Sequence, residues 1–348
     1  LPFPFIASCM KGTYLAYVRN AKFVSEASLP ALDLMGNCVV ELYKLDPTLA
    51  YQHAFVYLRE LSVLLRSAIT SKGKEAVKAV YSWQFINCLK VWTAVVVSQG
   101  DAPGAPLFPL VYPLCQLLLG TARLVPTPRY FALRFHVVRM LNDLSWSCGV
   151  FIPTARLLLD VLHSSYLHKQ ARHGARTSAP PRLHVSLKLA TAHLQSKTVQ
   201  DLLVRESLTL LLDHIAAYHH SVALPELAFP ALMQLRAFAK RTKVSAWRAL
   251  ARGAVDATQR QVDIVSGKRL QLDAAPRDTE KVASFMASEA AEAREKRRGR
   301  IAAARDAAEA EAEANASDDD GRGGAGAGKR RGKGKHSKGS KKGRGKSR

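Results

Sequence analysis

The side chains best suited to chemistry in this chain are its histidines, and their spacing does not favour a catalytic or metal site. His163, His168 and His173 recur at intervals of five, which spreads them around a helix. Metal ligation needs imidazoles that converge on one point, so this spacing predicts no metal site. Asp213 and His214 are neighbours in sequence, and a solvent-facing pair is the interpretation we prefer to a fragment of a catalytic triad.

The short motifs of common enzymes are also missing from the sequence. There is no G-x-S-x-G, no H-E-x-x-H and no G-x-x-x-x-G-K-[ST], and the segment 71–74 (Ser-Lys-Gly-Lys) lacks the upstream glycine of a phosphate-binding loop. The five cysteines stand singly, without a C-x-x-C pair, which predicts free thiols that pack as small apolar side chains. We therefore predict a protein that is not an enzyme and needs no cofactor.

The chemistry that the composition does favour is binding of a polyanion. The last 28 residues, 321–348, hold 12 Lys and Arg, 10 Gly and no acidic residue, so they predict a disordered cationic arm. Nucleic acid is the commonest partner of such an arm. The candidate nucleic-acid-binding residues in it are Lys329, Arg330, Arg331, Lys333, Lys335, Lys338, Lys341, Lys342 and Arg344.

A second basic segment lies inside the chain, over residues 168–182. It is a long polar stretch between helical patterns, and a loop of this length in a packed domain is usually functional or disordered. Its cations either contact RNA phosphates or stay solvated. The candidates are Lys169, Arg172, Arg176 and Arg182.

The charge is not confined to the tail. The formal net charge is +23, of which residues 1–275 carry +15 (31 basic less 16 acidic residues), so the body itself is basic. A membrane span is not indicated, because the charge-free stretch 102–122 contains four prolines among its first twelve residues. The opening Leu1 in place of Met suggests a fragment of a longer chain.

Apolar spacing of three and four predicts helix after helix. Asp46-Pro47 and Thr127-Pro128 place a capping side chain before a proline at the first helical position. The predicted helices are 8–24, 28–45, 47–70, 74–98, 107–124, 128–147, 153–167, 198–220, 225–241 and 243–265. We expect an all-α fold, a HEAT/armadillo-like helical repeat solenoid, with a compact helical bundle as the alternative.

Three regions follow from these patterns. Residues 1–275 form the predicted α-helical body, residues 276–314 a long Ala/Glu/Arg-rich helix, and residues 315–348 the disordered Gly/Lys/Arg tail.

Several blocks of the body resemble the nucleolar complex protein 2 family, in the same order along the chain. They cover about residues 8–265, and blocks in register are more specific than any one motif. The blocks are residues 11–23 (KGTYLAYVRNAKF), 81–89 (YSWQFINCL), 110–114 (LVYPL), 126–136 (PTPRYFALRFH), 196–201 (SKTVQD) and 226–230 (ELAFP).

The resemblance implies a helical scaffold of the nucleolus and nucleus that assists maturation of the pre-60S large ribosomal subunit and its rRNA. It implies pairing with nucleolar complex proteins 1 and 3, and a link to chromatin in animal members. Within the matching blocks, charges on apolar helices are candidates for binding a partner or phosphate, the alternative being a solvated helix face or an internal carboxylate pair. They are Arg19, Lys22, Arg129, Arg134 and Arg139.

Two further classes compete with an assembly factor. A chromatin regulator would use the same basic tail on DNA or nucleosomes. A transport receptor of the importin type is also a helical solenoid, but it would need an acidic inner surface for basic cargo, and the +15 body disfavours it.

Overall fold

The computed structural model describes residues 4–99, 104–168, 181–275 and 277–320, with the side chains of His168 and 304–320 excluded. Within these ranges the protein is all-α, as the apolar spacing predicts, and no strand is found. The longer helices are α1 (Phe5–Asn20), α2 (Leu29–Tyr43), α3 (Pro47–Ser71), α5 (Trp83–Gln99), α6 (Val111–Arg123), α7 (Phe131–Cys148), α8 (Ala155–Leu162), α11 (Lys197–Ala216), α12 (Leu224–Arg241), α13 (Ser245–Arg269) and α15 (Ala287–Asp320). The short ones are α4 (Lys74–Val80), α9 (Ser165–His168), α10 (Thr191–Leu194) and α14 (Thr279–Ser284), with 3-10 turns at Phe108–Leu110, Pro128–Tyr130 and Leu183–Val185.

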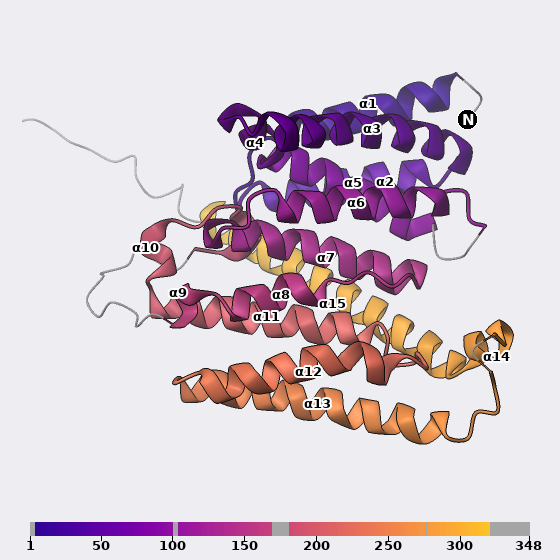
Figure 1. Cartoon of the computed structure of the whole chain (residues 1–348). Coiled ribbons are helices and arrows are strands. Elements are labelled where there is room, and N and C mark those ends of the chain that lie inside the picture. Colours follow the sequence, from indigo (N-terminus) through magenta and orange to yellow (C-terminus); the bar gives the residue numbers. More distant parts are fainter. Residues whose placement is uncertain (1–3, 100–103, 169–180, 276, 321–348) are drawn as a thin grey trace, which may run out of the picture. The chain divides into compact units, whose positions relative to one another are not determined.

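The chain divides into two compact units, residues 1–299 and 300–348. In the first unit the helices pack in successive layers, each against its neighbours in the chain (Figure 1). The layer of α1, α2 and α3 contacts α5 and α6, these contact α7, and α7 contacts α11. The α8 and α11 helices then contact α12 and α13. Helix α7 is buried on nearly every side, because its apolar residues face both halves of the unit.

The capping residues seen in the sequence account for only some of the helix starts. Asp46 caps α3 as expected, since its Oδ1 accepts from Thr48 N and Leu49 N at 3.0 Å each. Thr127 makes no side-chain cap bond, and the chain there forms a 3-10 turn before α7. The single helix predicted over 74–98 is wrong: it breaks into α4 and α5. Tyr81 turns inward at the break, where its hydroxyl donates to Thr121 O at 3.0 Å and accepts from Val125 N at 2.9 Å.

Replacing Asp46 with alanine should lower the free energy of unfolding by about 1 kcal/mol, because two N–H groups at the start of α3 lose their acceptor. Chemical denaturation monitored by circular dichroism would measure it. Asp46→Asn, which keeps the acceptor oxygen, should lose much less. Equal losses in the two variants would contradict a capping role.

The cysteines and the membrane prediction can be checked on the described residues. All five cysteines are free, and Cys88, Cys115 and Cys148 are buried, but Cys38 is exposed, so the prediction of buried thiols is wrong for it. None of the described helices is long and apolar enough to cross a membrane.

Candidate nucleic-acid interface

Among the described residues, the Asp213 and His214 pair is not arranged as in a catalytic triad. Asp213 does not bond His214. Its Oδ2 accepts from Asn142 Nδ2 at 3.0 Å, its carboxylate also contacts Arg297, and its backbone oxygen accepts from Trp146 Nε1 at 3.2 Å. The His214 ring packs instead beside Tyr218, with ring centroids 5.2 Å apart. In the described residues no group of three His, Cys, Asp or Glu side chains is placed to hold a metal ion. The feature of the described residues that bears on function is instead a surface rich in Arg and Lys side chains.

The surface arises because successive helices of the first unit run in alternating directions (Figure 1). The ends of α1, α6 and α12 and the starts of α5, α7, α11 and α13 consequently reach the same edge, at the left of Figure 1. Basic residues that are far apart in sequence are brought to this one edge by the packing.

Specific contacts join the helix ends along this edge. Asn87 Nδ2 donates to Ala21 O at 3.1 Å, which ties the start of α5 to the end of α1. The rings of Tyr81 and Tyr130 meet edge to face at 4.5 Å and link the α4–α5 turn to the start of α7.

The remaining joints lie further down the same edge. Leu189 N donates to Arg129 O at 2.7 Å, and Trp247 Nε1 donates to Asp201 Oδ1 at 2.5 Å, which fixes α13 to α11. The charges carried here are thus held on a rigid support.

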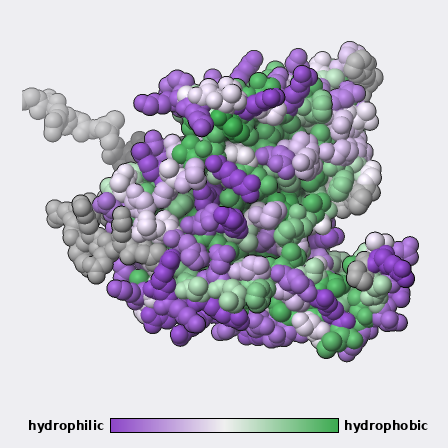
Figure 2. Space-filling view, in the orientation of Figure 1, coloured by the Kyte–Doolittle hydropathy of each residue, from purple (hydrophilic) through white to green (hydrophobic). Residues whose placement is uncertain are grey.

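We call this surface the basic edge. Its cations are Arg19, Lys22, Lys72, Lys74, Arg123, Arg129, Arg182, Lys188, Lys197, Lys240, Arg241, Lys243 and Arg248. All of them are exposed except Arg248, which is half-buried and donates to Thr242 O at 2.9 Å. The acidic side chains of this edge are Glu26, Glu75, Asp160 and Asp201. Figure 2 shows hydrophilic side chains gathered over the ends of α12 and α13 at its lower left.

Few of these cations are neutralised internally. Within the described residues, Arg182 pairs with Glu26, but no carboxylate lies within 4 Å of Arg19, Lys22, Arg129, Lys188, Lys197, Lys240 or Lys243. At the opposite edge the charges are mixed and paired, as in Lys44–Glu41 at 2.6 Å and Arg269–Glu226 at 2.6 Å. The unpaired excess of one sign distinguishes the basic edge, and an excess of this kind attracts polyanions.

The sequence-based candidates fall into three groups in the structure. Arg19, Lys22, Arg129 and Arg182 lie together on the basic edge. Arg134 and Arg139 have internal partners, described below. The others lie outside the described residues: Lys169, Arg172, Arg176 and the tail candidates Lys329, Arg330, Arg331, Lys333, Lys335, Lys338, Lys341, Lys342 and Arg344.

Two of the candidates, Arg134 and Arg139, have partners within the body itself. Arg134 is buried, its Nη1 donates to Leu157 O at 3.2 Å, and its guanidinium lies 5.5 Å from the Phe131 ring centroid. Arg139 forms an ion pair with Glu206, which is the internal carboxylate pair held open as the alternative. We therefore keep only Arg19, Lys22 and Arg129 as candidates for surface contact.

The comparison with known families decides the relationship of the chain. The model of the Noc2p family matches residues 4–296, which covers nearly all of the body and the start of α15. The chain belongs to the Noc2p family.

Curated members of the Noc2p family match over much of this chain. Nucleolar complex-associated protein 2 of Arabidopsis thaliana is 37% identical over 273 residues, which is 78% of this chain and 35% of that protein. Nucleolar complex protein 2 of Drosophila melanogaster is 36% identical over 234 residues, 67% of this chain and 30% of that protein. The chain thus spans about a third of the length of these relatives.

The first unit of this Noc2p family member also holds a half-buried ion cluster that sequence reasoning missed. Arg297, near the start of α15, donates through Nη2 to Asp143 Oδ1 at 2.7 Å and through Nε to Asp213 Oδ1 at 3.2 Å. Its guanidinium lies 5.2 Å from the Trp146 ring centroid. This Arg297 cluster fastens the first turns of α15 to α7 and α11, and its members are separated by 70 residues or more in pairs such as 143–213 and 213–297.

Proposed function

We propose that this protein is a non-catalytic ribosome assembly factor, acting as a helical scaffold in the maturation and nuclear export of the pre-60S subunit. Membership of the Noc2p family and the nucleolar names of the relatives support this role. The observation that carries it is the basic edge, on which Arg19, Lys22, Arg129, Lys188, Lys197, Lys240 and Lys243 have no carboxylate of the described residues within 4 Å and suit the phosphates of pre-rRNA. The nucleolus and nucleus are the proposed locations.

The layered packing supports a HEAT/armadillo-like solenoid as the form of the scaffold. In the first unit each layer of helices contacts the layers before and after it, as in repeat proteins. A protein of this kind presents long edges, and helix ends repeated along an edge can follow an extended RNA backbone. We propose that residues 1–275 form this body, that the charged region 276–314, most of which lies in α15, follows it, and that residues 315–348 act as a tethering arm.

The proposed protein partners are the sister nucleolar complex proteins 1 and 3. Arg19, Lys22 and Arg129 are exposed and can serve either a partner carboxylate or a phosphate, because a guanidinium binds both through two N–H groups. We assign no catalytic, cofactor or metal role to any residue of the body.

A charge-neutralised basic edge should bind RNA less tightly. The quadruple variant Lys22→Gln, Arg129→Gln, Lys188→Gln, Lys243→Gln is expected to raise the Kd for a pre-rRNA fragment about tenfold. The slope of log K against log salt should also become shallower by about 2–4, since each lost phosphate contact removes a released counterion. Fluorescence anisotropy at several salt concentrations measures both quantities.

The matched control removes the same charge from the other edge. Lys44→Gln, Lys268→Gln, Arg269→Gln and Lys281→Gln lower the net charge equally, but these residues lie away from the basic edge. If the two quadruple variants lose the same affinity, binding depends on net charge alone, and the assignment of the basic edge fails.

The cellular role is tested by purification of the tagged protein from cells. Enrichment of large-subunit precursor RNA and nucleolar partners is the expected result, and their absence would refute an assembly role. The alternative is a chromatin-associated transcriptional or histone regulator that uses the tail on nucleic acid. Deleting residues 321–348 separates the two, because loss of chromatin binding with subunit assembly intact would favour that alternative.

A further inference from the structure

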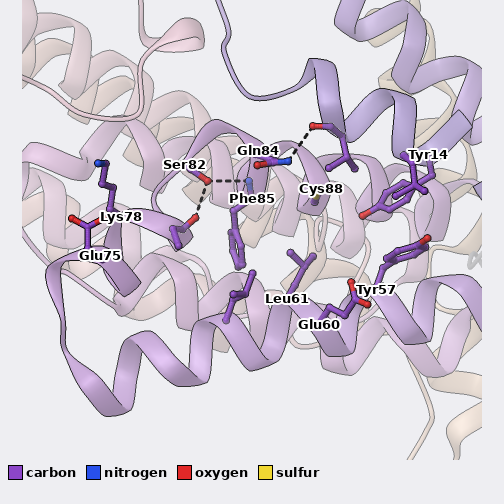
Figure 3. A pocket seen from close by; sticks show the side chains of 14 residues that line it. Tyr14, Tyr57, Glu60, Leu61, Glu75, Lys78, Ser82, Gln84, Phe85 and Cys88 are labelled. Carbon is purple, nitrogen blue, oxygen red and sulfur yellow. Dashed lines mark hydrogen bonds between the residues drawn. The ribbon is translucent and has the colours of Figure 1, made fainter. Parts of the chain in front are cut away.

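An apolar groove lies between α1, α3, α4 and α5, and it meets the basic edge at α4, where Glu75 belongs to both. Its volume is about 600 Å³, and its floor is formed by Tyr14, Tyr57, Leu61, Phe85 and Cys88 (Figure 3). Burial raises the pKa of the Cys88 thiol, so this sulfur stays protonated and contributes apolar surface. The groove is thus a hydrophobic site open to solvent.

The floor of the groove is held rigidly by contacts behind it. Trp92 Nε1 donates to the Tyr14 hydroxyl at 3.1 Å, and the Tyr57 ring stacks on the Trp92 ring with centroids 5.7 Å apart. Gln84 Nε2 donates to Val18 O at 3.3 Å and fixes α5 against α1. A groove that exists before its partner arrives loses less entropy on binding.

Apolar surface continues from the groove onto the outside of α3. The side chain of Leu64, on the groove wall, is 47% exposed, and Val63 beside it is 59% exposed. Figure 2 shows apolar surface among the polar side chains over α3 and α4. An exposed patch of this kind with a polar rim marks an interaction site for another protein.

The charged residues at the rim of the groove indicate the charge that a partner must carry. Glu60 stands beside Tyr57 at one end of the groove, and Glu75 stands with Lys78 at the other end (Figure 3). Both carboxylates are exposed, and no Lys or Arg side chain of the described residues lies within 4 Å of either. On a body of net charge +15, a groove with two unpaired carboxylates and one lysine has the opposite charge from its surroundings.

We propose that this groove binds an amphipathic helix of a partner protein, with an apolar stripe on the floor and Lys or Arg side chains paired with Glu60 and Glu75. Helices that dock in apolar grooves do so through side chains at i, i+3 or i+4 and i+7. The groove wall from Tyr57 to Leu64 spans two turns of α3, which matches such a stripe. The groove lining shares only Glu75 with the basic edge, so the protein could hold a protein and a polyanion together.

The probe is a fluorescein-labelled helical peptide of about fourteen residues, with leucines in an i, i+3, i+7 stripe and lysines beside the stripe. Anisotropy titration with the full chain should give saturable binding, about tenfold tighter than for the same peptide with glutamates in place of the lysines. The double variant Glu60→Lys, Glu75→Lys should reverse this preference, because the rim then has the opposite charge.

Leu64→Glu should weaken binding of the lysine peptide at least tenfold, since it places a charge on the apolar wall. The matched control is Ile264→Glu on α13, where the side chain is 50% exposed and outside the groove. Circular dichroism verifies that both variants are folded, and RNA affinity should be unchanged in both. Three results would overturn the proposal: no saturable binding of the lysine peptide, equal losses in Leu64→Glu and Ile264→Glu, or a charge preference unaffected by the double variant.

Discussion

Replacing Arg297 with methionine is expected to lower the free energy of unfolding by about 2 kcal/mol. The substitution keeps an unbranched apolar stem over Trp146 but removes the only guanidinium that contacts both Asp143 and Asp213 in the described residues. Breaking a fully buried ion pair costs about 3–5 kcal/mol, and an exposed one at most about 1. The value we expect lies between them, since Asp143 keeps 41% and Asp213 27% of its side-chain exposure.

The loss of stability has an electrostatic cause, because no other cation of the described residues takes the place of Arg297 between the Asp143 and Asp213 carboxylates. Desolvation by the surrounding protein raises the pKa of the Asp143 carboxyl above its usual value, and the charge of Arg297 opposes this rise. Without Arg297, Asp143 and Asp213 repel each other in a partly dry site. Chemical denaturation at neutral pH measures the loss.

The neighbouring arginine provides the control. Arg298 is exposed, so Arg298→Met should change the stability by less than about 0.5 kcal/mol. Adding Asp143→Asn and Asp213→Asn to the Arg297→Met variant should recover part of the loss, because the repulsion disappears. If Arg297→Met and Arg298→Met behave alike, the Arg297 cluster does not stabilise the fold.

The second large effect that we expect is a loss of folding stability at acidic pH. His214 is 4% exposed, and burial lowers its pKa to about 4, although the adjacent Asp213 acts in the opposite direction. The folded state therefore holds this imidazole neutral, while the unfolded chain binds a proton below about pH 6.5. Stability due to this group is complete above pH 6.5 and is lost as the pH falls from 6.5 toward 4.

For His214 alone the loss between pH 8 and pH 5 should be about 2 kcal/mol, at 1.4 kcal/mol for each pKa unit. His136 and His219, whose pKa burial also lowers to about 4, contribute with the same sign. His214→Phe should make the free energy of unfolding less dependent on pH, by the contribution of this one residue. Its ring can keep the contact with Tyr218, and the buried Nδ1 has no hydrogen-bond partner to lose.

Urea denaturation of both proteins at pH 8, 6.5, 5.5 and 5 provides the measurement. At pH 8 the two differ only by packing, and the difference between them should shift in favour of the variant as the pH falls. Parallel profiles would show that His214 titrates alike in the folded and unfolded states and would refute the prediction.

The sequence predicts most of the helices because apolar spacing and capping are local properties. The beginning of α3 at Asp46-Pro47 is an example, since its cap involves residues only two and three apart. The break between α4 and α5 is different. Ser82 gives it a local signal, since its hydroxyl accepts from Phe85 N at 3.3 Å at the start of α5. The Tyr81 hydroxyl, however, bonds Thr121 and Val125, which are 40 and 44 residues away and cannot be foreseen from the local sequence.

The candidate interface could be predicted only in part for a related reason. Arg19, Lys22 and Arg129 stand out in the sequence as charges on apolar helices. So do Arg134, which the fold buries, and Arg139, which pairs with Glu206. Lys188, Lys197, Lys240 and Lys243 were missed because nothing in their local sequence marks them. They gather only when antiparallel packing brings the ends of alternate helices to one edge.

Part of the basic edge is also electrostatically unfavourable in the absence of a bound anion. Its cations at the ends of α1, α6 and α12 lie at the negative poles of helix dipoles and are favourable there. Those at the starts of α7, α11 and α13, such as Arg129, Lys197 and Arg248, lie at positive poles and repel both the dipole and one another. A phosphate backbone that settles there removes this repulsion and meets helix N-termini suited to anions. If the polyanion binds as we propose, it would therefore act as a structural counterion of the fold as well as its ligand.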